Sequence, residues 1–124
     1  EERRSIFKAY TLINFGFAVV SIFIMKEYFS FFISVGFLHI FMLLLAFVDL
    51  KASWHTATWA FLFSAGLMVM YNYQLVGLDQ MLLIVLGILI LVALMRWKAK
   101  AHTPFELIMG VAAGLLAAIP ILFF

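Results

Sequence analysis

Residues 28–48 read YFSFFISVGFLHIFMLLLAFV, an apolar stretch in which only His39 ionises near neutral pH. A helix needs roughly 20 apolar residues to cross the hydrocarbon core of a bilayer. This stretch has that length and carries no fixed charge, so it predicts a transmembrane helix. An open strand would leave backbone groups unpaired in lipid, and barrel strands alternate in hydropathy, so neither fits the stretch.

Charged and polar residues divide the rest of the chain into four more stretches of this kind. The five predicted spans are residues 10–25, 28–48, 54–71, 79–96 and 104–124. Of the 124 residues, 68% are hydrophobic and 11% are charged. In soluble domains about half of the residues are apolar and about a quarter are charged. No linker or repeat separates the spans. We therefore predict one domain, residues 1–124, with an all-α fold: a polytopic transmembrane bundle of about five helices.

The start of the chain and its composition set further expectations. The chain begins at Glu1 rather than at a methionine, so we expect a processed or trimmed product whose full-length form has room for a sixth helix. The absence of cysteine excludes disulfides and thiolate metal sites. A formal net charge of +2 without a basic stripe argues against nucleic acid as a partner.

The last predicted span carries three local signals. Residues 103–106 read TPFE, a capping box with proline at the first helical position. Gly110 and Gly114 have the spacing that lets a neighbouring helix approach closely in a membrane. Pro120 lies inside the span, and we expect it to bend the helix.

Five crossings place the N-terminus and the segments 49–55 and 96–103 on one face of the membrane, here called side A. Segments 26–27 and 72–80 and the C-terminus fall on side B, where Lys26 is the only cation. The cations on side A are Arg3, Arg4, Lys8, Lys51, Arg96, Lys98 and Lys100. By the positive-inside rule side A is cytoplasmic, and we expect an integral protein of a bacterial plasma membrane.

Side A also holds two patches of residues that can carry chemistry. Lys51, Ser53 and His55 open the third span, and a second patch lies between the fourth and fifth spans. The second patch consists of Arg96, His102 and Glu106. Ionisable groups at membrane depth are costly unless they face solvent or have a function, so both patches are candidate site residues.

The second patch resembles the third signature of the type 2 phosphatidic acid phosphatase superfamily. That signature is Ser-Arg, five residues, His, three residues, Asp. Arg96 and His102 match it, Met95 stands in place of the serine and Glu106 in place of the aspartate. The first patch resembles the family's second signature, Pro-Ser-Gly-His, through Ser53 and His55. The order of the patches and the glycine-rich helix after the second one also agree with the family.

The resemblance covers about residues 49–124. The family's first signature, Lys, six residues, Arg-Pro, has no counterpart in the chain, and Lys51 is the candidate replacement for its phosphate-binding cation.

The resemblance implies a membrane-embedded lipid phosphate phosphatase. Such an enzyme hydrolyses phosphomonoesters or diphosphates through a phosphohistidine intermediate and needs no metal or other cofactor. Its partners would be membrane lipids, one of them the phosphorylated substrate. In this role His102 would be the nucleophile, Glu106 would orient its ring and His55 would be the general acid. The residues that would bind the substrate phosphate are Lys51, Ser53 and Arg96. Family members commonly face the periplasm or lumen, so the side that the site faces stays open.

Each of these residues also has a structural interpretation. Glu106 fits the third position of a capping box, Ser53 fits a helix cap, and Arg96 fits an ordinary positive-inside loop. His39 and Asn14 lie within spans, where an interhelical hydrogen bond is the expected role.

The rival function is therefore that of a non-catalytic small subunit, packed against other membrane subunits or against copies of itself. The missing first signature favours that alternative. A small transporter is a third class, but the chain lacks the broken helices and paired repeats expected of one.

Overall fold

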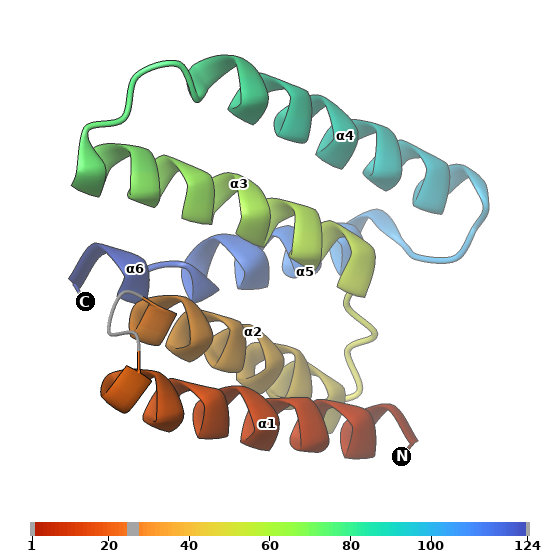
Figure 1. Ribbon diagram of the computed structural model, residues 1–124. Helices are drawn as coiled ribbons and strands as arrows, with labels where there is room; N and C mark the ends of the chain where they lie inside the picture. Colours follow the sequence, from red (N-terminus) through yellow and green to blue (C-terminus); the bar gives the residue numbers. More distant parts are fainter. Residues whose placement is uncertain (1, 25–27, 124) are drawn as a thin grey trace.

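The computed structural model describes residues 2–24 and 28–123, and within these ranges the chain is helical without strands (Figure 1). The helices are α1 (Glu2–Ile24), α2 (Phe29–Phe47), α3 (Trp54–Tyr73), α4 (Asp79–Lys98), α5 (Pro104–Ala117) and α6 (Pro120–Phe123). The predicted all-α helical bundle is thereby confirmed. The predicted loop 26–27, its cation Lys26 and the last residue of the fifth span lie outside the described residues.

Among the described helices, four stretches are long and apolar enough to cross a membrane, as expected of an integral membrane protein. They are α1, α2, α4 and the stretch Pro104–Phe123 that contains α5 and α6. Helix α3, predicted as the third span, is not among them. It has the length of a span, but polar residues at both of its ends and along it lower its hydropathy.

The helices are arranged around α3. Helix α3 contacts α4 on one side and α5 on the other, while α1 pairs with α2 and α2 packs against α5 and α6 (Figure 1). Helices α4 and α1 lie at opposite edges of the bundle (Figure 1), and Leu82 and Leu89 are the only buried described residues of α4. Because α3 has neighbours on several sides, its polar groups can find partners inside the protein.

Helices α3 and α5 approach each other closely at two glycines. A Cβ atom added at Gly110 would lie 2.5 Å from the carbonyl oxygen of Ser53, and one at Gly114 would lie 2.8 Å from the amide nitrogen of Phe61. These contacts are with backbone atoms, which cannot move aside as a flexible side chain can. The predicted close approach of a neighbouring helix is confirmed, and that helix is α3.

Three polar side chains of α3 donate hydrogen bonds to carbonyl oxygens of the last stretch. Thr56 Oγ1 lies 3.3 Å from the oxygen of Leu107, and Ser64 Oγ lies 3.2 Å from that of Leu115. Asn72 Nδ2 lies 2.7 Å from the oxygen of Ile121. The three donors are spaced eight residues apart on α3, so hydrogen bonds join this helix to the last stretch near its start, its middle and its end. We call these bonds the polar ladder.

Pro120, where the sequence predicts a bend, divides the last stretch into two helices. Helix α5 ends at Ala117 and α6 begins at Pro120, because proline has no N–H to continue the helical hydrogen bonds. The amides of Ile119 and Ile121 bond instead to carbonyl oxygens three residues back. The carbonyl oxygen of Ile121, in α6, accepts the hydrogen bond from Asn72.

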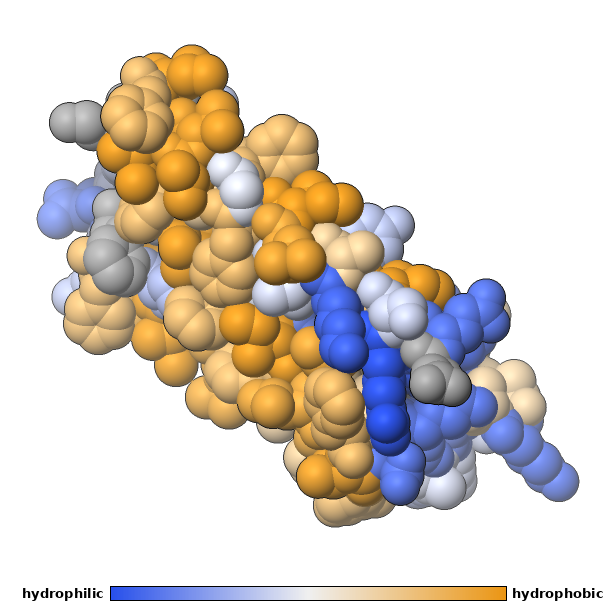
Figure 2. Space-filling model, turned by 90° about the horizontal axis from the view of Figure 1, so that it is seen from below, coloured by the Kyte–Doolittle hydropathy of each residue, from blue (hydrophilic) through white to orange (hydrophobic). Residues whose placement is uncertain are grey.

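Hydrophilic side chains gather at one end of the bundle (Figure 2). There the first turn of α1, residues 49–55 after α2 and residues 96–106 around the α4–α5 loop come together, and we call this region the polar end. Helix α1 begins at Glu2, earlier than the predicted span, so Arg3 and Arg4 are helical residues that reach this end. Arg4 forms a 3.2 Å ion pair with Asp49.

His39 and Asn14 form hydrogen bonds within their own helices rather than between helices. His39 Nδ1 lies 2.8 Å from the oxygen of Val35, and Asn14 Nδ2 lies 2.7 Å from the oxygen of Tyr10. The expected interhelical hydrogen bonds are therefore wrong for these atoms. The carbonyl four residues earlier in a helix lies within reach of a side chain, so a local bond satisfies each group without a partner helix.

Candidate functional site

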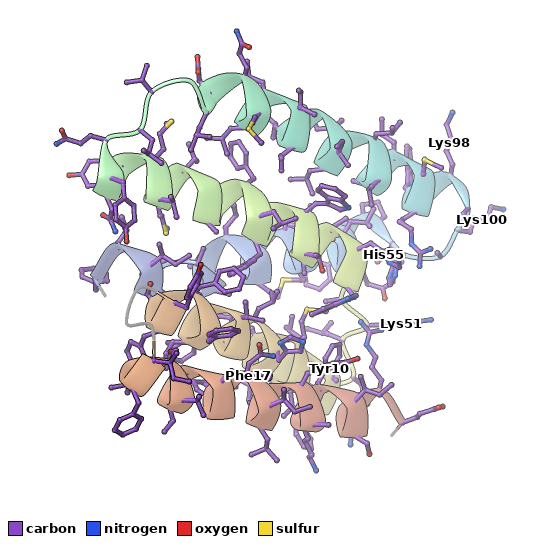
Figure 3. All side chains as sticks on the ribbon, in the orientation of Figure 1. Tyr10, Phe17, Lys51, His55, Lys98 and Lys100 are labelled. Atoms are coloured by element: carbon purple, nitrogen blue, oxygen red, sulfur yellow. The ribbon has the colours of Figure 1, made fainter. Side chains whose placement is uncertain are left out.

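The polar end brings both sequence patches together with the start of α1. The amide of Ser53 donates to the backbone oxygen of Glu106 at 3.2 Å, which joins the segment before α3 to the first turn of α5. Figure 3 shows the side chains of Lys51, His55, Lys98 and Lys100 at this same end. Two patches about fifty residues apart in sequence thus form one cluster.

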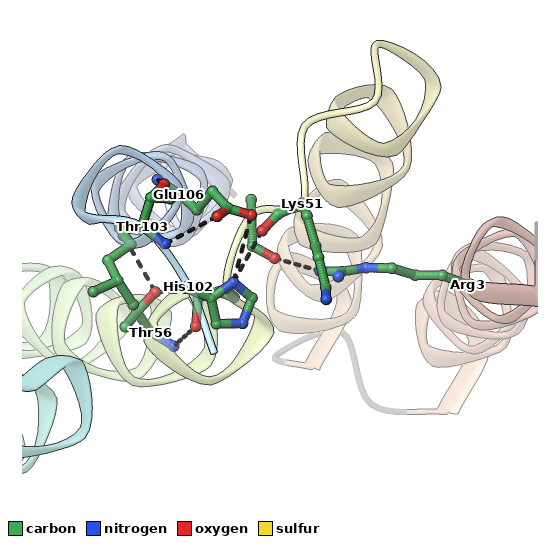
Figure 4. A network of polar contacts seen from close by, with 9 residues as sticks. Arg3, Lys51, Thr56, His102, Thr103 and Glu106 are labelled. Atoms are coloured by element: carbon green, nitrogen blue, oxygen red, sulfur yellow. Dashed lines mark hydrogen bonds and ion pairs between the residues drawn. The ribbon is translucent and has the colours of Figure 1, made fainter. Parts of the chain in front are cut away.

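His102 is at the centre of the cluster. Its side chain is 5% exposed, and its Nδ1 lies 3.1 Å from the carbonyl oxygen of Lys51 and 3.7 Å from Oε2 of Glu106 (Figure 4). Both neighbours are acceptors, so Nδ1 carries the proton and donates it to the Lys51 oxygen. In the neutral ring Nε2 is then the nitrogen with a free lone pair.

Glu106 has two roles in the structure. Its Oε1 accepts from the amide of Thr103 at 2.9 Å, and its own amide donates to Thr103 Oγ1 at 3.3 Å. The predicted capping box is confirmed. The other carboxylate oxygen faces His102, so the structural and the functional interpretation of Glu106 are compatible.

Ser53 is fully buried and caps α3. Its Oγ accepts a hydrogen bond from the amide of Thr56 at 3.4 Å. The structural interpretation of Ser53 as a helix cap is therefore confirmed. The hydroxyl lies beneath the surface of the polar end, where it fixes the segment that carries Lys51.

His55 and Arg96 face the cluster from the first turn of α3 and the last turn of α4. His55 is exposed, and the pKa of its ring is lowered, first by the part of it that is buried and then by the charges of Arg96 and His102. The Nε atom of Arg96 is buried and has no hydrogen-bond partner within the described residues. A buried N–H that lacks an acceptor is costly, and an anion bound beside Arg96 would supply one.

Lys51 contributes to the cluster through its backbone and its side chain separately. The carbonyl oxygen of Lys51 accepts the hydrogen bond from His102. Lys51 itself is exposed at the surface. Its ammonium group can therefore approach a ligand at the surface without disturbing the His102 ring.

Arg3 is a member of the cluster that the sequence did not single out. Its guanidinium donates a hydrogen bond to the carbonyl oxygen of Ala52, lies 5.5 Å from the ring centre of Phe7 and feels the charge of Glu106. In Figure 4 it reaches from α1 toward Lys51. No motif contains it, because its place depends on the pairing of α1 with α2.

A pocket of about 280 Å³ opens beside His102. Its lining residues are Trp97, Lys100, Ala101, His102, Thr103, Pro104 and Glu106. The pocket also lies at the N-terminus of α5, where the helix dipole favours an anion. Within the described ranges no group of three or more histidine, aspartate or glutamate side chains is placed to hold a metal ion.

The arrangement suits a phosphorylated ligand at the membrane surface. It combines a histidine of fixed tautomer, a second histidine and cations from three different segments. Comparisons of the chain with protein-family models, with curated proteins and with solved structures gave no match.

Proposed function

We propose that this protein is a membrane-embedded phosphatase that removes phosphate from a lipid through a covalent intermediate on His102. One observation carries the proposal: the hydrogen bond from His102 Nδ1 to the Lys51 oxygen, with the Glu106 carboxylate 3.7 Å away. This geometry leaves Nε2 as the nucleophile. The resemblance of both patches to the type 2 phosphatidic acid phosphatase superfamily supports the same role.

In the first step the Nε2 lone pair attacks phosphorus, and the bond between phosphorus and the lipid oxygen breaks. Burial and the neighbouring charges lower the pKa of His55, and the negative charge of the bound substrate phosphate opposes that effect. His55, protonated beside the phosphate, gives its proton to the leaving alkoxide. The His102 ring becomes positively charged as the N–P bond forms. The Glu106 carboxylate and the Lys51 oxygen stabilise that charge because both face the Nδ1 side of the ring.

In the second step water attacks the phosphohistidine. His55, now neutral, accepts a proton from the water, and the N–P bond breaks to release inorganic phosphate and restore the neutral His102 ring. The cycle consumes one water and returns both histidines to their starting forms.

The substrate phosphate would be held by cations. Arg96 offers a buried Nε without an acceptor among the described residues, and Lys51 offers an exposed ammonium group. Arg3 adds a third positive charge from α1, and Lys51 stays the candidate replacement for the cation of the missing first signature. Ser53, buried under the surface of the polar end, holds the segment that carries Lys51 in place by capping α3.

The location of the site agrees with a lipid substrate. The polar end lies where the apolar helices stop, which is the depth of lipid phosphates in a bilayer. The excess of cations at this end favours the cytoplasmic side of a bacterial plasma membrane.

A non-catalytic subunit of a larger membrane complex is the second candidate. The observation in its favour is α4, which has only Leu82 and Leu89 buried among its described residues and offers a face to another subunit. That role does not require the fixed His102 tautomer or the unpaired Arg96 Nε.

The test is phosphate release from a panel of lipid phosphates in detergent, without added metal, by the native protein and by His102→Asn. The asparagine amide can still donate to the Lys51 oxygen but has no Nε2 lone pair. Release by the native protein and none by the variant would support the phosphatase. His39→Asn is the control, because His39 is also buried but its Nδ1 bonds to the Val35 oxygen of its own helix and not to a residue of the cluster around His102. No release by a folded native protein from any lipid would overturn the proposal and favour the subunit.

A further inference from the structure

A second, purely apolar pocket lies directly beside the candidate site. It has a volume of about 320 Å³ and lies between the end of α4 and the start of α5. Its lining residues are Ala93, Leu94, Trp97, Pro104, Leu107 and Ile108. We call it the α4–α5 groove. It shares Trp97 and Pro104 with the pocket at His102, so the two are adjacent.

The groove opens toward the bilayer rather than toward water. Leu94 and Ile108, which line it, are 48% and 63% exposed, and both belong to stretches that can span a membrane. Exposed apolar side chains on such stretches face hydrocarbon. The groove is therefore accessible from the lipid side.

The two pockets differ in depth as well as in polarity. Ala93 lies four residues before Trp97 on α4, and Ile108 lies four residues after Pro104 on α5. At a rise of about 1.5 Å per residue, both positions are about 6 Å farther from the polar end. Polar lining at the membrane surface is thus followed by apolar lining deeper in the bilayer.

We propose that the α4–α5 groove binds the hydrocarbon chain of the same lipid whose phosphate lies at His102. The inference rests on the proposed function and makes its substrate more specific: a lipid that stays in the bilayer and enters sideways between α4 and α5. A phospholipid has the same order of parts as the two pockets, first a phosphate and then a chain. The continuity of the groove with the site favours this occupant over a helix of another subunit.

The scarcity of packing around α4 supports the route. Leu82 and Leu89 are the only buried described residues of α4, and neither lines the groove. By contrast, the polar ladder and two glycines hold α5 firmly against α3. A lipid can therefore displace side chains between α4 and α5 without separating the α3–α5 pair.

The first experiment uses His102→Asn in nanodiscs of phosphatidylcholine, because the native protein would hydrolyse the phosphatidic acid probe. A small fraction of phosphatidic acid with a photoreactive diazirine in its acyl chain is added, and cross-linked residues are mapped by mass spectrometry. The reference is phosphatidylcholine with the same diazirine chain. We expect labelling of residues 93–97 and 104–108 to be enriched about 10-fold for the phosphatidic acid probe. Equal labelling by the two probes at these residues would overturn the proposal.

The second experiment fills the groove. Ala93→Trp adds a large side chain to the lining, and Leu91→Trp adds the same side chain to an exposed position of α4 outside the groove. We expect Ala93→Trp to abolish the enrichment and raise KM for a long-chain phosphatidic acid about 10-fold, with a much smaller change in kcat. Leu91→Trp should behave as the native protein. If Ala93→Trp does not fold, Ile108→Trp serves the same purpose.

The outcomes separate the two proposals. Enriched labelling without any phosphate release would support the groove and overturn the phosphatase. Phosphate release that is unaffected by groove-filling variants would support the phosphatase and overturn the groove.

Discussion

The ring Nδ1 of His102 lies 3.1 Å from the carbonyl oxygen of Lys51, although the two residues are 51 positions apart in the chain. This hydrogen bond fixes the tautomer of a buried histidine and also joins the α4–α5 loop to the segment before α3. One contact therefore has a structural and a chemical consequence, and substitutions can separate the two.

His102→Ala leaves the space of a buried ring empty and removes its hydrogen bond. We expect it to destabilise the protein by about 1–3 kcal/mol, because the Lys51 oxygen loses its donor. His102→Asn keeps a donor at the same place and should be less destabilising. Thermal unfolding in detergent, followed by circular dichroism, ranks the two variants. Equal loss of Tm would mean that the hydrogen bond does not stabilise the polar end.

Glu106→Gln separates the capping role of this residue from its charge. Glutamine also fits the third position of a capping box, so Tm should stay within a few degrees of the native value. Without the negative charge the His102 ring loses a partner for its developing positive charge, and phosphate release should fall roughly 10- to 100-fold.

Glu106→Ala is the comparison, because it removes both the charge and the carboxylate that accepts from the Thr103 amide in the capping box. It should lower both Tm and activity, with a stability loss of about 0.5–2 kcal/mol. Native activity in Glu106→Gln would exclude a role for the charge.

His55→Asn tests the general acid through the leaving group. For a lipid phosphate the alkoxide needs a proton, so we expect a loss of about 100- to 10,000-fold. For p-nitrophenyl phosphate the phenolate leaves without a proton, so the loss should be far smaller. Steady-state rates with both substrates give the comparison, and the same loss with each would rule His55 out as the acid.

Arg3→Ala tests the cation that α1 brings to the site. We expect kcat/KM to fall roughly 10-fold or more, because Arg3 is close enough to Glu106 to feel its charge. Arg4→Ala is the matched control, since Arg4 is the next residue but pairs with the exposed Asp49. A surface ion pair of this kind contributes about 1 kcal/mol or less. Similar activity of the two variants would place Arg3 outside the phosphate-binding set.

Gly114→Ala tests the close contact of α5 with α3. The added methyl group meets backbone atoms of Ala57 and Phe61, and we expect a loss of about 1–3 kcal/mol. Gly87→Ala is the control, because a Cβ at this exposed glycine of α4 meets nothing within 4 Å. There alanine should raise stability by about 0.5–1 kcal/mol through its better helix propensity. Thermal unfolding of both variants measures the two changes in stability. A Gly114→Ala protein as stable as the native one would contradict the close contact between α5 and α3.

Features encoded by neighbouring residues could be predicted from the sequence. The apolar run 28–48 predicts α2, residues 103–106 predict the capping box, and Pro120 predicts the break before α6. Each of these depends on the chemistry of a few consecutive residues, and local chemistry does not change when the chain folds.

Features that depend on distant contacts could not be predicted in the same way. Arg3 meets Ala52 across 49 positions, and no spacing in the sequence records that contact. The sequence also gave no reason to prefer the cap over phosphate binding for Ser53, because both need the same hydroxyl. The α4–α5 groove is missed for a related reason, since it exists only where two helices meet.

The polar ladder has a consequence for how the protein enters the bilayer. Helix α3 is not apolar enough to be counted with the four spanning stretches, and its Thr56, Ser64 and Asn72 donate to carbonyl oxygens of residues 107–121. During synthesis α3 leaves the ribosome before those acceptors exist. Helix α3 is therefore inserted stably only after α5 and α6 have been made. In a chain that ends after α4, the polar side chains of α3 would have no hydrogen-bond acceptors on α5 and α6, and their burial in the bilayer would be costly.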